Sequence, residues 1–425
     1  MLKDQNRPVF AIIGSGWGGS TLARLLDTAK YDVVVLSPDM TFSYTPLLAS
    51  AACGLFDFSL AAESIRQPGS RVRFVRATVH DIDFASKQLN CTAQDEINSE
   101  IKFLFSFDQL VITPGTTVNT FGTPGVHEHA MVMRNAHDAL KFRLRLFDQL
   151  ERASLPCIDD ETRNGLLHVI VVGGGPTGLE LVAELSDMIR CQLNKIFPHL
   201  YENISISVHD VAGSILTSFD EKLAEYGTAK LRARNIEIHT SSHIEKIEAG
   251  AIVTKELGRV NAGVVVWATG NKAIPLIEDL KARKTEKGLP RILTTDRLQV
   301  TRDDEERTII EGVYALGDAA DVDGATLPTT AEVATQKATY LASMLNGKIA
   351  EPEAWSPFQY KQRALVTYLG NHDGVIGGRE DWTGASAWLA WRSGTLMWTW
   401  SWSRRVKILF TWTMDRLVGR DIVQN

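Results

Sequence analysis

The chain has 425 residues, a length that predicts two or three compact units. Its content of 44% hydrophobic and 23% charged residues is typical of globular proteins and excludes a disordered or fibrous chain. The 45 basic and 51 acidic residues give a net charge of −6, so no basic surplus supports nucleic-acid binding as the main function. The longest apolar stretch is shorter than the roughly 18 residues that a membrane-spanning helix needs.

Four cysteines are scattered along the chain, at Cys53, Cys91, Cys157 and Cys191. They form no C-x-x-C pair, which excludes a zinc ribbon and a local dithiol redox centre. The first predicted strand is not preceded by a cationic start and an apolar run, so a secretory signal is not indicated. We therefore expect an intracellular protein with reduced thiols.

The first chemical signal is a glycine-rich turn at 14–19. Residues 9–13 form a short apolar run typical of a strand buried on both faces of a parallel sheet. The turn satisfies G-x-G-x-x-G, and a helix from 20–26 and a second strand at 32–36 complete a βαβ unit. In such a unit the three glycines allow a tight turn, the approach of a pyrophosphate, and close packing of helix on strand. The helix N-terminus then favours the phosphate charge.

A second copy of this pattern begins 159 residues later. Residues 168–172 are the predicted strand, 173–178 the glycine-rich turn, and 179–185 part of the following helix. A single G-x-G-x-x-G is weak evidence, because glycine-rich turns also arise by chance. Two copies, each between a strand and a helix, predict two dinucleotide sites, which we interpret as one for a flavin and one for a nicotinamide.

An acidic residue follows the second strand of the second unit. The strand at 204–208 leads into His209 and Asp210, which places a carboxylate where the ribose 2′-hydroxyl of NADH would lie. That charge favours NADH and repels the 2′-phosphate of NADPH. The alternative is a solvated acid at a strand end. The matching strand of the first unit has no acid at its tip, so its ribose contact is left open.

Three more strand-and-turn segments extend the series, at 111–115, 264–270 and 312–318. Asp318, at the end of the last segment, is suited to accept hydrogen bonds from a flavin ribityl chain. Each segment alone is compatible with a structural turn. In this order they predict an α/β protein with two Rossmann-type domains, the two-dinucleotide flavoprotein fold.

The chain resembles the type II NADH dehydrogenases, single-subunit flavoenzymes that pass electrons from NADH to quinone, and is most similar to their fungal and plant branch. The resemblance covers nearly the whole length. It is carried by the motifs at 14–18, 26–28, 37–38, 44–48, 119–126, 173–180, 358–361 and 419–422. A generic disulfide reductase would lack most of these and would carry paired cysteines.

The resemblance implies a domain order. The flavin domain would comprise 1–164 and 276–350, the NADH domain 165–275, and a membrane-association or dimerisation region 351–425. By motif position the FAD contacts would be Gly14, Ser15, Gly16, Trp17, Gly18, Gly115 and Asp318. The NADH contacts would be Gly173, Gly175, Pro176, Thr177, Gly178, Asp210 and Gly270.

The resemblance also assigns Glu180 to the contact between flavin and nicotinamide. The alternative is an ordinary first-turn acid stabilised by the helix dipole.

The predicted acceptor site departs from the family pattern. The family carries Ala-Gln-x-x-x-Gln on the helix beneath the flavin, whereas this chain has Glu332 and Gln336 at those positions. The spacing of four places both on one helical face, and Pro46 joins them in the predicted acceptor site. An ionised carboxylate cannot donate a hydrogen bond to a quinone. We therefore expect Glu332 to have a raised pKa or to act as a general acid or base.

Other family residues also differ, since Asp39 replaces an arginine and 55–58 replace an acidic–basic pair.

The C-terminal region from 384 to 420 combines aromatic and basic residues. Six basic residues and one acid give it a local charge of +5. These are Arg392, Arg404, Arg405, Lys407, Arg416, Arg420 and Asp415. On one helix, Trp388, Trp391, Trp398 and Trp402 would form a single stripe, which predicts a helix lying on a membrane surface. The alternatives are packing on the protein's own body and a homodimer interface.

These observations lead to a main hypothesis and two alternatives. The main one is an FAD-dependent NADH oxidoreductase that passes electrons to a quinone or quinone-like molecule. The second is a tailoring flavoenzyme of specialised metabolism with Glu332 as acid or base, and the third is a redox-sensing or scaffold flavoprotein. We expect an intracellular, peripheral membrane protein. Residues 1–8 are too short for a transit helix, so mitochondrial import is not expected unless a presequence was removed.

Overall fold

The computed structural model describes residues 7–94, 100–347, 351–363, 365–378 and 381–418. The chain forms two compact units. Unit 1 comprises 1–42, 64–117 and 271–361, and unit 2 comprises 43–63, 118–270 and 362–425. The short strands β3 (Thr41–Ser43), β4 (Ala62–Ser64) and β10 (Thr117–Val118) lie where the chain passes from one unit to the other.

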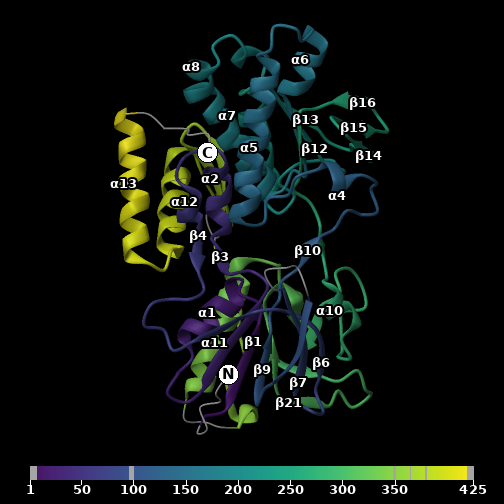
Figure 1. The fold of residues 1–425 in the computed structure, drawn as a ribbon, viewed down its shortest axis with the longest axis vertical. Coiled ribbons are helices and arrows are strands. Elements are labelled where there is room, and N and C mark those ends of the chain that lie inside the picture. Colours follow the sequence, from purple (N-terminus) through teal and green to yellow (C-terminus); the bar gives the residue numbers. More distant parts are fainter. Residues whose placement is uncertain (1–6, 95–99, 348–350, 364, 379–380, 419–425) are drawn as a thin grey trace. The chain divides into compact units, whose positions relative to one another are not determined.

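Unit 1 is built on an eight-stranded sheet of order β22-β19-β20-β21-β9-β1-β2-β5. Its centre is parallel, from β21 through β9, β1 and β2 to β5. The predicted strand at 9–13 is confirmed as β1, and all five of its residues are buried because layers cover both faces. Helices α1 and α11 pack together on one face, as Figure 1 shows, and a second sheet of β6, β7 and β8 covers the other.

The main-sheet strands are β1 (Val9–Ile13), β2 (Asp32–Ser37), β5 (Arg73–Arg76), β9 (Gln109–Ile112), β19 (Ile292–Thr294), β20 (Gln299–Thr301), β21 (Ile309–Ala315) and β22 (Ala320–Val322). The second sheet has β6 (Thr78–Asp83), β7 (Gln88–Gln94) and β8 (Glu100–Ser106). The helices are α1 (Trp17–Leu25), α10 (Pro275–Asp279) and α11 (Ala331–Asn346), and β18 (Asn271–Lys272) opens the last segment.

A buried ionic cluster joins α11 to the edge of the main sheet. Arg291 NH1 lies 2.7 Å from Asp321 Oδ2, and Lys337 Nζ lies 3.9 Å from Asp321 Oδ1. The Lys337 side chain is fully buried, and this burial lowers its pKa to about 8. Its ammonium also donates to the backbone oxygen of Ala320, 3.2 Å away. One carboxylate therefore faces two buried cations.

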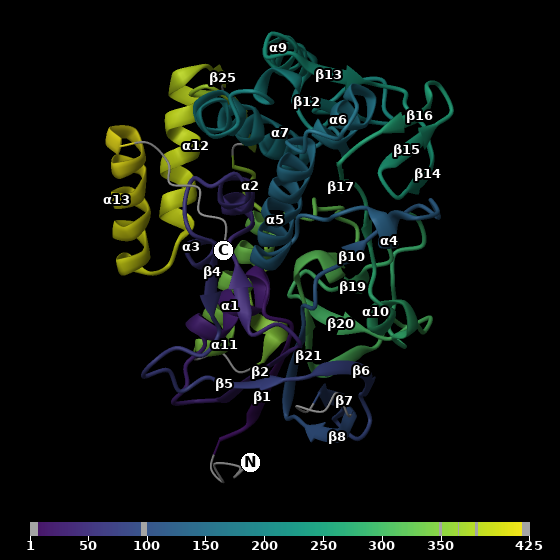
Figure 2. The ribbon, with the colours of Figure 1, turned by 45° about the horizontal axis from the view of Figure 1, so that its top comes forward.

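Unit 2 is built on a four-stranded parallel sheet of order β13-β12-β11-β17. The predicted strand at 168–172 is confirmed as β11, and helix α7 follows the second glycine-rich turn. Helix α7 lies beside α2, as Figure 2 shows. It also packs against β23 of the C-terminal sheet, and α12 packs on β24.

The strands of unit 2 are β11 (His168–Val172), β12 (Ser205–His209), β13 (Ile236–His239), β14 (Ile244–Glu248), β15 (Ala251–Thr254), β16 (Gly258–Asn261), β17 (Val264–Trp267), β23 (Leu365–Gly370), β24 (Asp373–Gly377) and β25 (Trp382–Thr383). Its helices are α2 (Leu48–Ala52), α3 (Phe58–Ala61), α4 (Val126–His129), α5 (Ala136–Ala153), α6 (Asp160–Leu167), α7 (Pro176–Met188), α8 (Asn194–Ile196), α9 (Glu221–Arg232), α12 (Ala385–Trp398) and α13 (Trp402–Val418). None of the helices in the described part of the chain is both long and apolar enough to cross a membrane.

We predict that Asp321→Ala lowers the free energy of unfolding by about 3–5 kcal/mol, because it removes the carboxylate that pairs with two buried cations. Urea unfolding measures this effect. The matched control is Asp323→Ala, which removes a partly exposed carboxylate paired with Arg283 and Arg307 and is expected to change stability by less than about 1 kcal/mol. Equal effects of the two substitutions would contradict the prediction.

Candidate functional site

The first glycine-rich turn is shaped by contacts that leave no room for side chains. Gly14 has a φ of +97°, and a Cβ on it would lie 2.3 Å from the backbone oxygen of Thr113. A Cβ on Gly19 would lie 2.0 Å from the backbone oxygen of Gly14. Gly16 differs, because a Cβ there meets nothing within 4 Å. The turn therefore keeps open space over its second glycine only.

Neighbouring turns meet the first glycine-rich turn at one edge of the sheet. The strands before these turns are parallel neighbours: Ile13 of β1 lies beside Ile112 of β9, and Ile112 lies beside Ala315 of β21. Their carboxyl ends therefore place 14–19, 113–115 and 317–318 together, at the edge where ligands bind in folds of this type. Gly115 and Gly317 both have positive φ values, of +76° and +74°.

Three of the predicted FAD residues are held by other side chains of unit 1. The Ser15 hydroxyl donates to Ser37 Oγ at the tip of β2, 2.9 Å away. The Trp17 ring stands edge-on to Phe42, with centroids 4.8 Å apart. Gly18 packs against Leu316, whose Cδ1 would lie 2.3 Å from a Cβ at that position. Gly16 caps α1 without a side-chain hydrogen bond, so the helix N-terminus keeps its backbone N–H groups for another acceptor.

The second glycine-rich turn has the same construction. Gly173 has a φ of +116°, and a Cβ on Gly178 would lie 2.2 Å from the Gly173 backbone oxygen. A Cβ on Gly175 would again meet nothing within 4 Å. Pro176 is the first residue of α7, and the side chains of Pro176 and Thr177 are exposed. Both turns therefore combine tight first and third glycines with an open second one.

Asp210 lies at this second turn. Its Oδ2 accepts the backbone N–H of Gly174 at 2.5 Å, and its Oδ1 accepts that of Ala212 at 2.8 Å. The carboxylate therefore binds the backbone of this turn, and its contact with a ribose stays a prediction. Gly270, at a φ of +76°, lies under the ring of Phe121, which would be 2.6 Å from a Cβ there.

Glu180 lies in the second turn of α7, so the alternative of a first-turn acid is wrong. The indole Nε1 of Trp391 donates to Glu180 Oε1 over 3.1 Å. Burial raises the pKa of Glu180 to about 8, and the nearby charge of Glu184 acts in the same direction. The carboxyl is thus protonated in most molecules at pH 7.

Glu332 and Gln336 lie on one face of α11, as the spacing predicted. Gln336 Nε2 donates to Glu332 Oε1 at 3.0 Å and to the backbone oxygen of Lys361 at 2.9 Å. Gln336 Oε1 accepts the Lys361 N–H at 3.1 Å. An amide nitrogen has two N–H groups, so both are engaged. Pro46 belongs to unit 2, and its place in the acceptor site stays a prediction.

The four tryptophans that were predicted to share a stripe do not form one exposed stripe, which corrects the sequence analysis. Helix α12 ends at Trp398 and α13 begins at Trp402, so two separate helices carry them. Trp391 is only 5% exposed, whereas Trp402 is 76% exposed. The break is fixed by Arg405, whose guanidinium donates to the backbone oxygens of Thr399 and Met397.

Most of the described basic residues in this region contact the protein itself. Arg392 lies 3.8 Å from Glu184, and Arg404 donates to the backbone oxygens of Ser59 and Ala62. The Lys407 side chain is exposed. The side chains of Asp415 and Arg416 and the motif at 419–422 with Arg420 lie outside the described residues.

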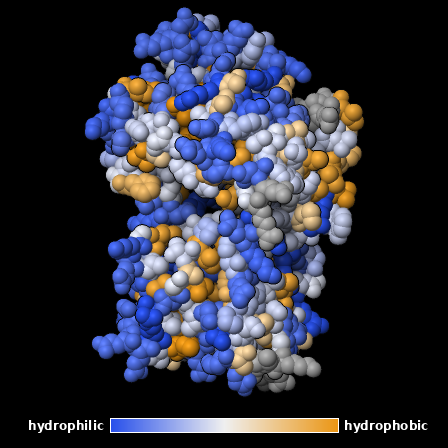
Figure 3. Space-filling view, turned by 180° about the vertical axis from the view of Figure 1, so that it is seen from behind, coloured by the Kyte–Doolittle hydropathy of each residue, from blue (hydrophilic) through white to orange (hydrophobic). Residues whose placement is uncertain are grey.

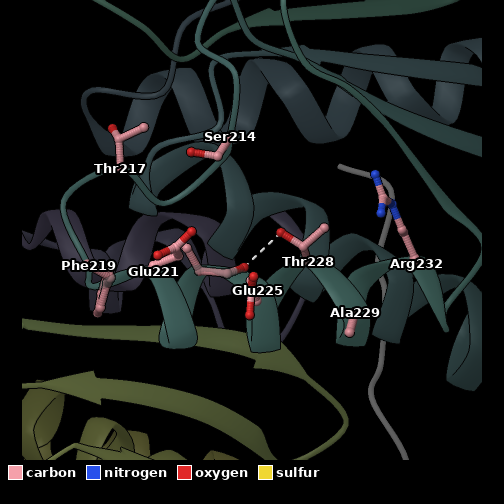
Figure 4. Close-up of a pocket in the computed structure, with 9 residues that line it drawn as sticks. Ser214, Thr217, Phe219, Glu221, Glu225, Thr228, Ala229 and Arg232 are labelled. Atoms are coloured by element: carbon pink, nitrogen blue, oxygen red, sulfur yellow. Dashed lines mark hydrogen bonds between the residues drawn. The ribbon is translucent and has the colours of Figure 1, made fainter.

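A further pocket of about 680 Å³ lies in unit 2, between the loop after Asp210 and α9 (Figure 4). Ser214, Thr217, Glu221 and Glu225 line it. The same loop covers the second glycine-rich turn from its other side, where Ile215 packs on Gly174. Arg232 also lines the pocket, so its lining carries two carboxylates and one guanidinium.

Sequence reasoning missed the partners of the α7 acids, which come from distant segments. Ser50 donates to Glu184 Oε1 at 2.6 Å, and Trp391 donates to Glu180 across 211 positions of sequence. A signal was present, because three acids at 180, 184 and 187 interrupt an otherwise apolar helix on one face.

A family model described as pyridine nucleotide-disulphide oxidoreductase matches residues 9–338. A probable NADH dehydrogenase of Dictyostelium discoideum is 32% identical over 97% of this chain and 90% of its own length. The internal alternative NAD(P)H-ubiquinone oxidoreductase A1, mitochondrial, of Solanum tuberosum is 32% identical over 99% of this chain and 88% of its own.

The structure of NDH2 from Plasmodium falciparum in complex with NADH has the same fold, with a TM-score of 0.89 at 22% identity, covering 99% of this chain and 100% of that chain. The four cysteines are free, so the redox disulfide of the wider family's name has no counterpart among the described residues. The chain belongs to the pyridine nucleotide-disulphide oxidoreductase family and, within it, to the type II NADH dehydrogenases, the alternative NAD(P)H-ubiquinone oxidoreductases.

Proposed function

We propose that the protein is an NADH:quinone oxidoreductase. When bound, FAD would accept hydride from NADH and deliver two electrons to ubiquinone or a related quinone. The observation that carries the proposal is the pair of glycine-rich turns, each open over its second glycine and each followed by a helix N-terminus without a side-chain cap. Membership of the type II family supplies the direction of electron flow.

The residues of unit 1 fit a bound FAD. The open space over Gly16 allows a pyrophosphate to approach the backbone, and the N-terminus of α1 favours its charge. The carboxyl edge of β1, β9 and β21 places Gly115 and Asp318 beside this turn, where Asp318 would hold the ribityl chain. We assign FAD to the predicted segments 1–164 and 276–350, of which 43–63 and 118–164 belong to unit 2.

The residues of unit 2 fit NADH in the same way, with its pyrophosphate over Gly175 and the N-terminus of α7. Asp210 would accept the ribose hydroxyls and repel the 2′-phosphate of NADPH. We assign NADH to the predicted domain 165–275. Glu180, whose raised pKa keeps it protonated at neutral pH, would hold a proton close to the nicotinamide.

The acceptor would bind at Glu332 and Gln336 of unit 1, and Pro46 of unit 2 remains the third predicted contact. Both N–H groups of Gln336 are engaged by Glu332 and Lys361, so the amide has to leave these partners before it can donate to a quinone carbonyl. Glu332 donates only when it is protonated.

We also propose that unit 2 binds a membrane surface through the outer face of α13, in the predicted region 351–425. Apolar side chains repeat along this face, as Figure 3 shows by their colour at the edge where α13 lies. They are Trp402 at 76% exposure, Val406 at 59%, Phe410 at 65% and Leu417 at 75%. The aromatic rings suit the headgroup level, and a peripheral membrane location follows.

Gly16→Val should abolish FAD binding without unfolding the protein, because the added side chain meets only open space until a pyrophosphate approaches. Gly175→Val should retain FAD and lose reduction by NADH. Flavin absorbance of the purified proteins and thermal unfolding measure both effects. The contrasting variant is Gly19→Val, which should unfold at lower temperature because its Cβ meets a backbone oxygen. A yellow, FAD-loaded Gly16→Val protein would refute the assignment of the first turn.

Anaerobic stopped-flow tests the acceptor. We expect fast flavin reduction by NADH, followed by fast reoxidation by a short-chain ubiquinone. Glu332→Gln restores an amide that can donate to a quinone, so quinone reoxidation should accelerate by roughly two- to tenfold, the worth of one neutral hydrogen bond. Glu311→Gln, at an exposed acid of unit 1, is the control. Slow quinone reoxidation that neither substitution changes would overturn the quinone acceptor and favour a small-metabolite substrate.

Phe410→Glu should lower binding to vesicles of phosphatidylcholine and phosphatidylglycerol by about tenfold or more, since it puts a charge in place of an exposed aromatic ring that would insert into the bilayer surface. Co-sedimentation measures the bound fraction. Leu144→Glu, at an exposed apolar position on α5, is the control and should leave binding unchanged. If Phe410→Glu instead leaves vesicle binding intact and dissociates a dimer in solution, this face is a homodimer interface.

A further inference from the structure

Helix α7 carries three acids on one face, and the C-terminal segment contacts each of them. Trp391 of α12 donates to Glu180, Arg392 lies 3.8 Å from Glu184, and the Tyr368 hydroxyl of β23 donates to Asp187. The acids are spaced by four and three residues, so they follow one side of the helix. The helix that begins at the second glycine-rich turn is therefore bound along its length by the end of the chain.

The indole of Trp391 is held in one orientation. Its side chain is almost completely buried, and its ring stacks on Tyr368 with centroids 5.1 Å apart and planes 13° apart. Tyr368 is fixed in turn by Asp187, which also accepts a hydrogen bond from Arg234 at 2.5 Å. The N–H of a ring fixed in this way points at a single carboxylate oxygen, so the contact is built by the fold rather than by chance rotation of an exposed side chain.

The surroundings of Glu180 oppose its negative charge, apart from two hydrogen-bond donors. Glu184 lies on the same helix and disfavours a second charge, while Arg392 of α12 is directed at Glu184. Trp391 and the backbone of Tyr368 favour the ionised form by hydrogen bonding. Of these two donors only the indole belongs to a side chain, so it can be removed by substitution.

We propose that Trp391 is a positioning residue for Glu180, through which the C-terminal segment sets the orientation and proton affinity of this carboxyl. The inference rests on the proposed place of Glu180 at the contact between flavin and nicotinamide. In this role Trp391 acts through Glu180, by the hydrogen bond between the two side chains. Its N–H directs one carboxyl oxygen and stabilises the ionised form.

The test compares Trp391→Phe with Trp388→Phe in the FAD-loaded full-length enzyme. Both substitutions keep an aromatic ring on α12, but the indole N–H of Trp388 has no hydrogen-bond partner among the described residues. Infrared spectroscopy follows the carboxylic C=O band that Glu180→Gln removes, as a function of pH. We expect Trp391→Phe to move the titration of this band upward by about one pH unit, because a donor to the charged form is lost. Trp388→Phe should leave it in place.

The pH dependence of flavin reduction by NADH is the second measurement. Trp391→Phe should shift its inflection in the same direction as the infrared titration. If Glu180→Gln leaves this inflection unchanged, Glu180 does not act in the reaction and its proposed role fails. If Glu180→Gln removes the inflection but Trp391→Phe moves neither titration, the role of Glu180 stands and the inference about Trp391 is wrong. An equal shift in Trp388→Phe would also overturn it, since the effect would then be one of packing.

Discussion

The structure depends on the close approach of a glycine to a neighbouring backbone carbonyl at the end of a parallel strand. Gly14 faces Thr113 and Gly173 faces Ala268, and in each turn the third glycine packs onto the carbonyl of the first. Because these contacts exclude every side chain, the helix begins directly over the sheet edge and its free N–H groups face the open second glycine. The open space over the second glycine of each turn, and the start of helices α1 and α7, follow from this single constraint.

Much of the fold was predictable because its signals are local. An apolar run such as 9–13 or 168–172 identifies a strand buried on both faces, and the adjacent glycines specify the turn. The shared helical face of Glu332 and Gln336 was predictable for the same reason, since a spacing of four is a property of the helix alone. The contacts of Gln336 with the backbone of Lys361 were not, because they join segments that no periodicity relates.

The C-terminal region shows where a pattern misleads. Tryptophans at helical spacing predicted one stripe, yet the helix breaks after Trp398, and Trp400 packs on Tyr44 with its backbone N–H donating to the Tyr44 hydroxyl. Only the tertiary partners decide which indole is buried and which is exposed. The same holds for the arginines, whose charge suggested lipid contact but whose described side chains bind carbonyls and carboxylates of the chain.

The contacts made by the acidic face of α7 make the fold of unit 2 depend on the C-terminal segment. Residues 365–398 provide each of the three carboxyls of this face with a polar partner: Trp391 for Glu180, Arg392 for Glu184 and Tyr368 for Asp187. Loss of this segment, by proteolysis or by a premature stop, would uncover those carboxyls together with the apolar side of α7. Truncation therefore removes a structural part of unit 2 as well as a surface helix. A shortened chain would be a substrate for quality control rather than a soluble form of the enzyme.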